Sequence, residues 1–191
     1  MLAALLVAPA CARGQRASAP SAAPPRCEAW ALSTFTTPPG LLHRDRYGMG
    51  EAAAPPWSPP PTGWQLPGDV TLDVTLARQS PTAIVVRATL ANTARAPRVV
   101  YLLTPGLGVS ATLQGDGVSL LPPPPPRAGE TPPPNPFPEE TLYVLPAEAR
   151  WVFEATVDPR CWRHAPGARA EVVWTFSLLG GRMGRLPLTL P

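Results

Sequence analysis

Apolar and polar residues alternate strictly along several short stretches of the chain. Residues 70–77 (VTLDVTLA) place Val and Leu on one face and Thr and Asp on the other. A period of two over eight residues is typical of a β-strand with one buried face. The same pattern predicts further strands at 83–91, 98–104, about 107–113, 118–121, 140–145, 150–157, 170–179 and 185–190.

Turn residues follow each of these stretches. Gln114-Gly115-Asp116-Gly117 predicts a tight turn, and Gly180-Gly181 predicts the turn of a final hairpin. No stretch shows a convincing helical period, so crossover helices for a parallel sheet are absent from the pattern. Eight or nine short strands at this spacing predict an all-β, antiparallel sandwich or barrel over residues 69–191.

The first residues form a short apolar segment. Residues 1–10 end in Ala8-Pro9-Ala10, small residues that suit a signal peptidase, and Cys11 follows directly. The same bond fits a bacterial lipobox, in which the Cys after the cleavage site is acylated, although Ala8 stands where a lipobox usually has Leu. Both interpretations predict an exported protein whose mature chain starts at Cys11.

Three further segments are rich in proline. Residues 11–26 contain mainly small residues, Pro and Arg, which predicts a flexible tether. Residues 27–68 also carry several aromatic residues, and we expect an irregular segment that packs on the sandwich. Residues 122–138 hold ten prolines and predict an exposed loop with polyproline II character.

The three cysteines agree with export. If Cys11 carries lipid, Cys27 and Cys161 remain as a pair, and an oxidising compartment favours a disulfide between them. This bond would close a loop of 133 intervening residues. In the chain-entropy model, such a closure stabilises the folded state by about 4–5 kcal/mol.

Composition and charge exclude further classes of protein. Arg supplies all 16 basic residues, which together with 30 Pro and 15 Gly indicates a GC-rich genome. The formal net charge is +3, and the arginines are spread singly along the chain, so no nucleic-acid partner is predicted. No apolar run is long enough for a polytopic membrane protein, and we expect contact with the membrane through lipid on Cys11.

The order of strands and turns resembles a known family. The residues that carry the resemblance are Leu90-Ala91-Asn92-Thr93, Pro97, Val99 to Pro105, Gly108, Pro126-Arg127, Leu145-Pro146, Val157-Asp158 and Pro166-Gly167 before Val172. They resemble the immunoglobulin-like domain that precedes the catalytic part of deuterolysin-type secreted metalloproteases and also occurs alone in bacterial lipoproteins. The family often has a Tyr two residues after the Pro-Gly, where this chain has Arg169. The resemblance implies a single immunoglobulin-like β-sandwich that acts as a binding or accessory module, without the protease part.

The sequence offers no catalytic constellation. The two histidines, His43 and His164, have no metal-ligand spacing, and neither a hydrolase elbow nor a phosphate-binding loop is present. We therefore predict no enzyme activity, no metal site and no cofactor. Trp57, Trp64 and Trp162 stand in turn-rich segments, where they either bind a sugar or protein partner or cap the open ends of the sandwich.

These observations predict a lipid-anchored module at the outer membrane or the periplasmic face of the cell envelope, with secretion as the alternative. Its partner would be an envelope protein or a glycan. Two other functions remain open. The loop 122–138 would serve a secreted protease inhibitor, and the three tryptophans would serve a carbohydrate-binding module.

Overall fold

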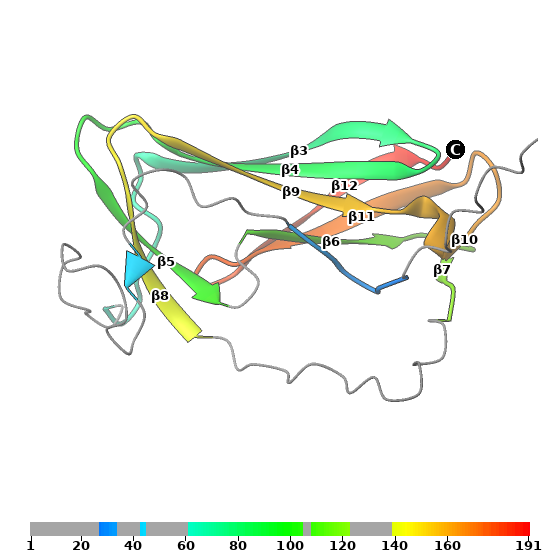
Figure 1. The fold of residues 1–191 in the computed structure, drawn as a ribbon, viewed down its shortest axis with the longest axis horizontal. Helices are drawn as coiled ribbons and strands as arrows, with labels where there is room; N and C mark the ends of the chain where they lie inside the picture. Colours follow the sequence, from blue (N-terminus) through cyan, green and yellow to red (C-terminus); the bar gives the residue numbers. More distant parts are fainter. Residues whose placement is uncertain (1–26, 34–42, 45–60, 105–107, 123–138) are drawn as a thin grey trace, which may run out of the picture.

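A computed structural model describes residues 27–33, 43–44, 61–104, 108–122 and 139–191 of the chain (Figure 1). The described chain is built almost entirely from antiparallel strands. A single helical turn occurs in this part, the short 3-10 helix η1 (Pro159–Cys161). No helix among the described residues is long and apolar enough to cross a membrane.

One sheet consists of β3 (Val70–Ser80), β4 (Ala83–Asn92) and β9 (Arg150–Val157), in that order. Alternation along these strands creates the buried face, because successive side chains point to opposite sides of a sheet. In β9, every second residue from Trp151 to Val157 is buried. The pairing of β3 with β4 shifts register between Leu76 and Arg78, which marks a β-bulge in the edge strand.

The second sheet has the order β1 (Ala31–Leu32), β6 (Val109–Gln114), β11 (Arg169–Phe176) and β12 (Arg182–Thr189). Gly180 and Gly181 form the turn between β11 and β12 with φ of 83° and 65°. Residues other than Gly, Asn and Asp rarely adopt this left-handed backbone conformation, which explains the two glycines in the turn of the hairpin.

Five more strands occur in the described residues, four of which are β2 (His43–Arg44), β5 (Arg98–Thr104), β7 (Ser119–Leu120) and β8 (Glu139–Leu145). The two-residue β10 (Trp162–Arg163) pairs with β7. β5 pairs with β8 and also reaches the chain after β11 through a bridge between Leu102 and Leu178. β5 and β6 therefore lie one after the other along the same edge of the chain segment that begins with β11.

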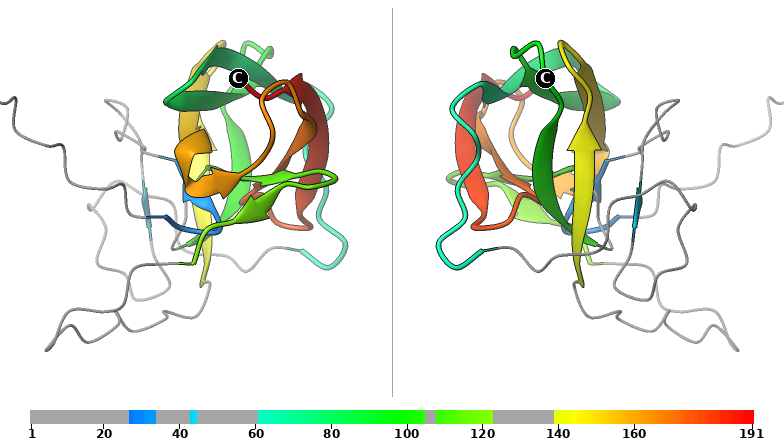
Figure 2. Two further views of the ribbon diagram at one scale, coloured as in Figure 1. Left: turned by 90° about the vertical axis from the view of Figure 1, so that its right-hand side faces the viewer. Right: turned by 90° about the vertical axis from the view of Figure 1, so that its left-hand side faces the viewer.

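The two sheets face each other and enclose the core (Figures 1 and 2). The rings of Phe153 on β9 and Phe176 on β11 meet edge to face between them, with centroids 5.2 Å apart. Ile84, Leu90 and Leu113 are also buried in this core. One sheet contains β3, β4 and β9, and the facing sheet contains β6, β11 and β12. This arrangement matches an immunoglobulin-like sandwich, in which strands A, B and E form one sheet and strands C, F and G the other.

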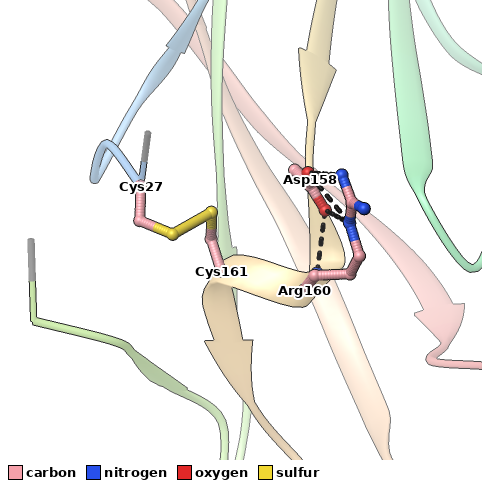
Figure 3. The surroundings of a disulfide bond; sticks show 4 residues. All are labelled: Cys27, Asp158, Arg160 and Cys161. Atoms are coloured by element: carbon pink, nitrogen blue, oxygen red, sulfur yellow. Dashed lines mark hydrogen bonds and ion pairs between the residues drawn. A yellow bond between two sulfur atoms is a disulfide. The ribbon is translucent and has the colours of Figure 1, made fainter. Parts of the chain in front are cut away.

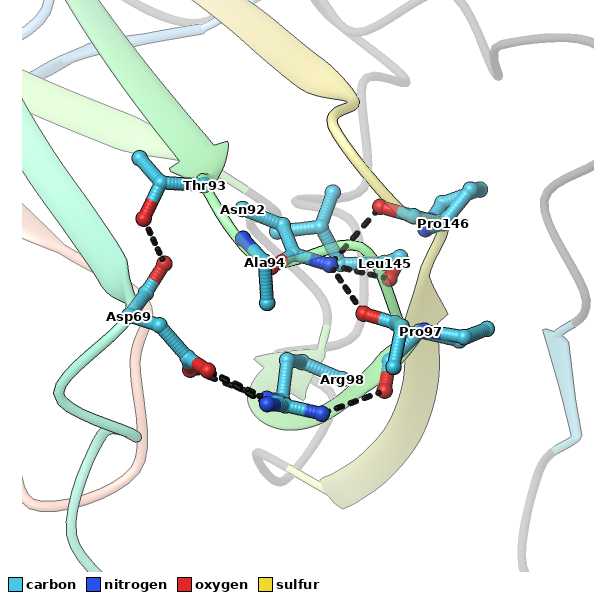
Figure 4. A network of polar contacts seen from close by, with 9 residues as sticks. Asp69, Asn92, Thr93, Ala94, Pro97, Arg98, Leu145 and Pro146 are labelled. Atoms are coloured by element: carbon cyan, nitrogen blue, oxygen red, sulfur yellow. Dashed lines mark hydrogen bonds and ion pairs between the residues drawn. The ribbon is translucent and has the colours of Figure 1, made fainter.

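A buried amide closes one end of the sandwich (Figure 4). Asn92 Nδ2 donates to the carbonyls of Ala96 and Pro146, both at 2.9 Å, and to that of Leu145 at 3.3 Å. Asn92 Oδ1 accepts from the amide of Ala94 at 3.0 Å. The side chain thus joins the end of β4, the turn that follows it and the end of β8.

The predicted all-β sandwich is confirmed. Most predicted strands agree closely in their bounds, but β11 ends at Phe176 rather than 179, β12 begins at Arg182 rather than 185, and the segment 118–121 contributes only β7. The short strands β1, β2 and β10 and the helical turn η1 were not predicted. This helical turn forms because Asp158 accepts from the amide of Arg160 at 3.0 Å and Pro159 occupies its first position. The predicted signal peptide 1–10, the predicted tether 11–26 and most of the predicted Pro-rich loop 122–138 lie outside the described residues.

Candidate functional site

The outer face of the second sheet carries a continuous row of side chains. Register places Ser110 on β6 between Leu32 on β1 and Thr175 on β11, and places Thr175 beside Met183 on β12. Their neighbours Val109, Ala111 and Phe176 are buried, so the row points away from the core. Ser110 Oγ and Thr175 Oγ1 are 2.7 Å apart and hydrogen-bonded to each other.

A hollow of about 530 Å³ lies beside this row. Ser110, Thr175 and Met183 line it together with Leu103 and the turn residues Gly180 and Gly181. Its size falls within the range of ligand pockets in proteins. Leu32 is 60% exposed and Met183 is 76% exposed, so two large apolar side chains of the row stand in solvent.

A second hollow, of about 800 Å³, occupies the opposite end of the sheet near the β6–β7 turn. Its walls include the polar or charged residues Gln114, Arg169, Glu171 and Arg185 beside apolar ones such as Pro187. Arg185 Nη1 lies 2.7 Å from Glu171 Oε2, so these two charges neutralise each other. The outer face therefore changes from apolar and hydroxyl-bearing at one end to charged at the other.

The outer face of the first sheet differs in character. Arg87 on β4 and Glu154 on β9 form a cross-strand ion pair, with Arg87 Nε 2.8 Å from Glu154 Oε1. Thr71, Asp73 and Thr75 on β3 are exposed beside them. A solvated polar face of this kind is typical of a sandwich. Val152 on β9 is also 50% exposed, so what distinguishes the second sheet is the hollow beside its row.

The disulfide lies at the side where the two sheets meet (Figure 3). Cys27 is joined to Cys161, with the two Cα atoms 5.2 Å apart, a normal separation for a disulfide. Cys161 ends η1, and Asp158 stands at the start of this helical turn. The Arg160 guanidinium hydrogen-bonds to Asp158 and lowers the pKa of that carboxyl.

The structure describes two of the three tryptophans that were predicted as binding candidates. Trp64 is half-buried and meets the ring of Tyr101 edge to face, with centroids 5.3 Å apart. Trp162 is half-buried, stands opposite Leu120 and packs against the core. Both therefore cover the sandwich, which was one of the two predicted roles. Trp57 lies outside the described residues, as does Cys11.

Ionisable side chains do not gather into a metal-binding set in the described ranges, which contain no group of three His, Cys, Asp or Glu. The phenol of Tyr143 is the one side chain whose pKa is strongly raised there, because burial disfavours its charged form. The ring of Tyr143 packs edge to face on Trp151, with centroids 6.2 Å apart, in the core. Its environment accords with a packing role.

Sequence reasoning missed the row of Leu32, Ser110, Thr175 and Met183. These four residues come from four strands, so their proximity depends on register, which is not written in any one stretch of sequence. The glycine that follows Met183 does not signal this row. A Cβ atom at Gly184 would stand 2.6 Å from the ring of Trp174, which packs against the core on the other side of the sheet.

Comparisons with models of protein families, with curated proteins and with solved structures return no match. The resemblance to the domain found with deuterolysin-type metalloproteases therefore stays a prediction.

Proposed function

We propose that the protein is an exported, lipid-anchored binding module of the bacterial cell envelope, without enzyme activity of its own. It binds a protein partner through the outer face of β1, β6, β11 and β12. Cys11 carries the lipid, and the sandwich is the part that meets the partner.

The observation that carries the binding function is the row of Leu32, Ser110, Thr175 and Met183 beside the hollow, with an exposed large apolar side chain at each end. Exposed large apolar side chains that cluster on one face are typical of interaction surfaces, whereas scattered ones are ordinary. Leu32 and Met183 flank Ser110 and Thr175, whose hydroxyl groups offer directional hydrogen bonds. Such a mixture of apolar and hydroxyl groups suits a protein surface with its own apolar and polar positions.

The disulfide supports the proposed compartment. Cys27 and Cys161 form a disulfide. Disulfides persist in oxidising environments and are rare in the cytosol of mesophilic bacteria. The third cysteine, Cys11, follows the A-x-A segment and is the residue that a lipobox would acylate. The cysteines of the chain are thus all used in an exported lipoprotein.

The binding face is tested by photo-crosslinking in the cells that make the protein. A photoreactive amino acid placed at Met183 is expected to give discrete covalent adducts with an envelope protein. The matched control is the same amino acid at Val152, which is 50% exposed on the outer face of β9. Equal adducts from both positions, or none from Met183, would contradict the proposed face.

The anchor is tested by cell fractionation with the variant Cys11→Ala. The wild-type protein is expected in the membrane fraction and the variant in the soluble fraction, because a protein without the cysteine cannot be acylated. Cys27→Ala serves as the control, since it removes a cysteine but leaves the lipid attachment site. Wild-type protein in the cytosol would refute the anchor.

A further inference from the structure

The segment 27–33 lies across the side of the sandwich where β6 and β9 approach each other. Its strand β1 contacts both of them, and a small hollow of about 100 Å³ is lined by Ala31 together with Ala111 and Val157. We call residues 27–33 the strap. Figure 1 shows the strap in blue beside β6.

The strap makes a short ladder on β6. Ala31 stands opposite Ala111 and Leu32 opposite Ser110, and the amide of Ser33 donates to the carbonyl of Val109 at 2.9 Å. In contrast, β11 pairs with all six residues of β6 on the other side. The strap is therefore the lesser partner of this strand.

Side-chain burial holds the strap unevenly. Leu32 is 60% exposed, and Glu28 and Ala29 are exposed as well. Trp30 is 38% exposed, so more than half of this side chain is removed from water. The hydrophobic contribution to holding a segment scales with the apolar area removed from water, so apart from the short ladder the strap is held mainly by Trp30 and by the disulfide.

The covalent bond sits at the first residue of the strap. Cys27 is half-buried, whereas Cys161 is 3% exposed. An attacking thiolate therefore reaches Cys27 Sγ more readily than Cys161 Sγ. The disulfide keeps the strap at high local concentration beside β6, in the way that a short linker does for two binding modules.

We propose that the Cys27–Cys161 disulfide is a redox-controlled latch whose reduction releases the strap and opens the edge of β6. A thiolate of a dithiol reductant attacks Cys27 Sγ, forms a mixed disulfide and displaces the Cys161 thiolate, which takes up a proton. The second thiol of the reductant then closes its own disulfide and releases Cys27 as a thiol. Two electrons pass from the dithiol to the protein, and the sandwich gains an open strand edge.

An open strand edge can bind another polypeptide chain. Its unpaired amides and carbonyls accept an extended segment of another chain. Release of the strap would present the backbone of Ala111 in this way, next to Ser110 and Thr175 on the same sheet, while Leu32 would leave the row with the strap. The latch would thus couple the redox state of the compartment to the surface that the sandwich offers.

The hydrogen-bond pattern supplies an internal control. Because the 33/109 pair is hydrogen-bonded, alternation makes 31/111 the next such pair, so the amide of Ala111 faces the strap. The amide of Ser177 donates to the carbonyl of Gly108, so the same alternation directs the amide of Thr112 to β11. Adjacent amides of one strand thus report on opposite edges.

The test is amide hydrogen exchange of the full-length protein, oxidised and after reduction with dithiothreitol. The ratio of the Ala111 to the Thr112 exchange rate is expected to rise at least about tenfold on reduction, because the strap opens locally. It is expected to return on reoxidation. Cys27→Ser should reproduce the reduced state, and Ala29→Ser, which keeps the disulfide, should behave as wild type.

Several outcomes would overturn the latch. An unchanged ratio with both rates raised would mean that the bond is a global staple, since global unfolding exposes the two amides together. Unchanged rates would mean that the strap stays bound without the bond. Loss of the folded sandwich on reduction, or failure of the ratio to return on reoxidation, would equally exclude a switch.

Discussion

At the scale of single residues, two polar side chains hold one end of the sandwich together. Asn92 is 2% exposed and bonds to carbonyls of two other segments. Nearby, the guanidinium of Arg98 meets both carboxylate oxygens of Asp69, with Nε at 2.9 and 2.8 Å (Figure 4). The first contact is buried and the second is partly solvated, so they respond to different perturbations.

Replacing Asn92 by Ala is expected to lower the free energy of unfolding by about 2–3 kcal/mol, because it leaves buried carbonyls without a donor. Asn92→Asp should cost more at neutral pH, since it places a carboxylate against those carbonyls. Thr93→Ala, which removes one exposed bond to the carbonyl of Asp69, is the control and should cost less than about 1 kcal/mol. Urea unfolding measures all three. A loss for Asn92→Ala no larger than for Thr93→Ala would contradict this role.

Acid should weaken the Asp69–Arg98 pair in a defined direction. The hydrogen bonds from Arg98 lower the pKa of Asp69 below its ordinary value of 3.8. As pH falls through that value, the unfolded chain binds a proton first, so the contribution of the pair is complete at neutral pH and is lost below about pH 3.8.

The variant Asp69→Asn is expected to reduce this part of the acid dependence in urea unfolding between pH 7 and pH 2.5. Asp73→Asn, at an exposed residue on the neighbouring strand β3, should retain the wild-type dependence. If the Asp69→Asn profile keeps the full wild-type slope, the pair does not contribute.

At the scale of elements, the short strand β1 depends on a close approach to β6. Gly108 has φ of 103°, and a Cβ atom there would stand 2.4 Å from Ser33 Oγ and 2.5 Å from Phe153 Cδ1. The position therefore admits glycine alone, both for its backbone conformation and for the space around it.

Gly108→Ala is expected to lower the free energy of unfolding by about 2–4 kcal/mol, from backbone strain and displacement of the Phe153 ring. Gly117→Ala is the matched control. It has φ of 72° and nothing within 4 Å of the added carbon, so it should cost only about 1 kcal/mol. Equal losses for both variants, measured by thermal or urea unfolding, would mean that the contact with Ser33 and Phe153 carries no weight.

The strands differ in how well the sequence predicts them. Strict alternation predicted β3 and β9 closely, because each strand buries one face and the period is local. β1 has two paired residues and no period to detect, so it could not be predicted. The role of Asn92 was missed for another reason. Its acceptors Leu145 and Pro146 lie 53 and 54 residues further along the chain.

At the scale of the whole molecule, both open sides of the sandwich are joined. On one side the strap lies between β6 and β9, with the disulfide at its start. On the other, the Gln79 side chain of β3 donates to the carbonyl of Thr189 on β12. The two joints differ in kind, because a hydrogen bond re-forms freely whereas the disulfide depends on the redox state of its surroundings.

This difference links the fold to the proposed compartment. A cross-link between residues 134 positions apart restricts the unfolded chain strongly and therefore favours the folded state, provided that the bond stays oxidised. The proposed face of β1, β6, β11 and β12 includes the strap, so its shape also depends on that bond. Export, the disulfide and the binding surface thus form one account.

The most direct test of this account is the intact mass of the native protein from membrane and soluble fractions, alkylated before and after reduction. The account predicts a membrane species that starts at Cys11 with lipid attached, takes up no alkyl groups before reduction and takes up two after it. A species that retains Met1 and offers three free thiols would contradict export, the anchor and the disulfide together.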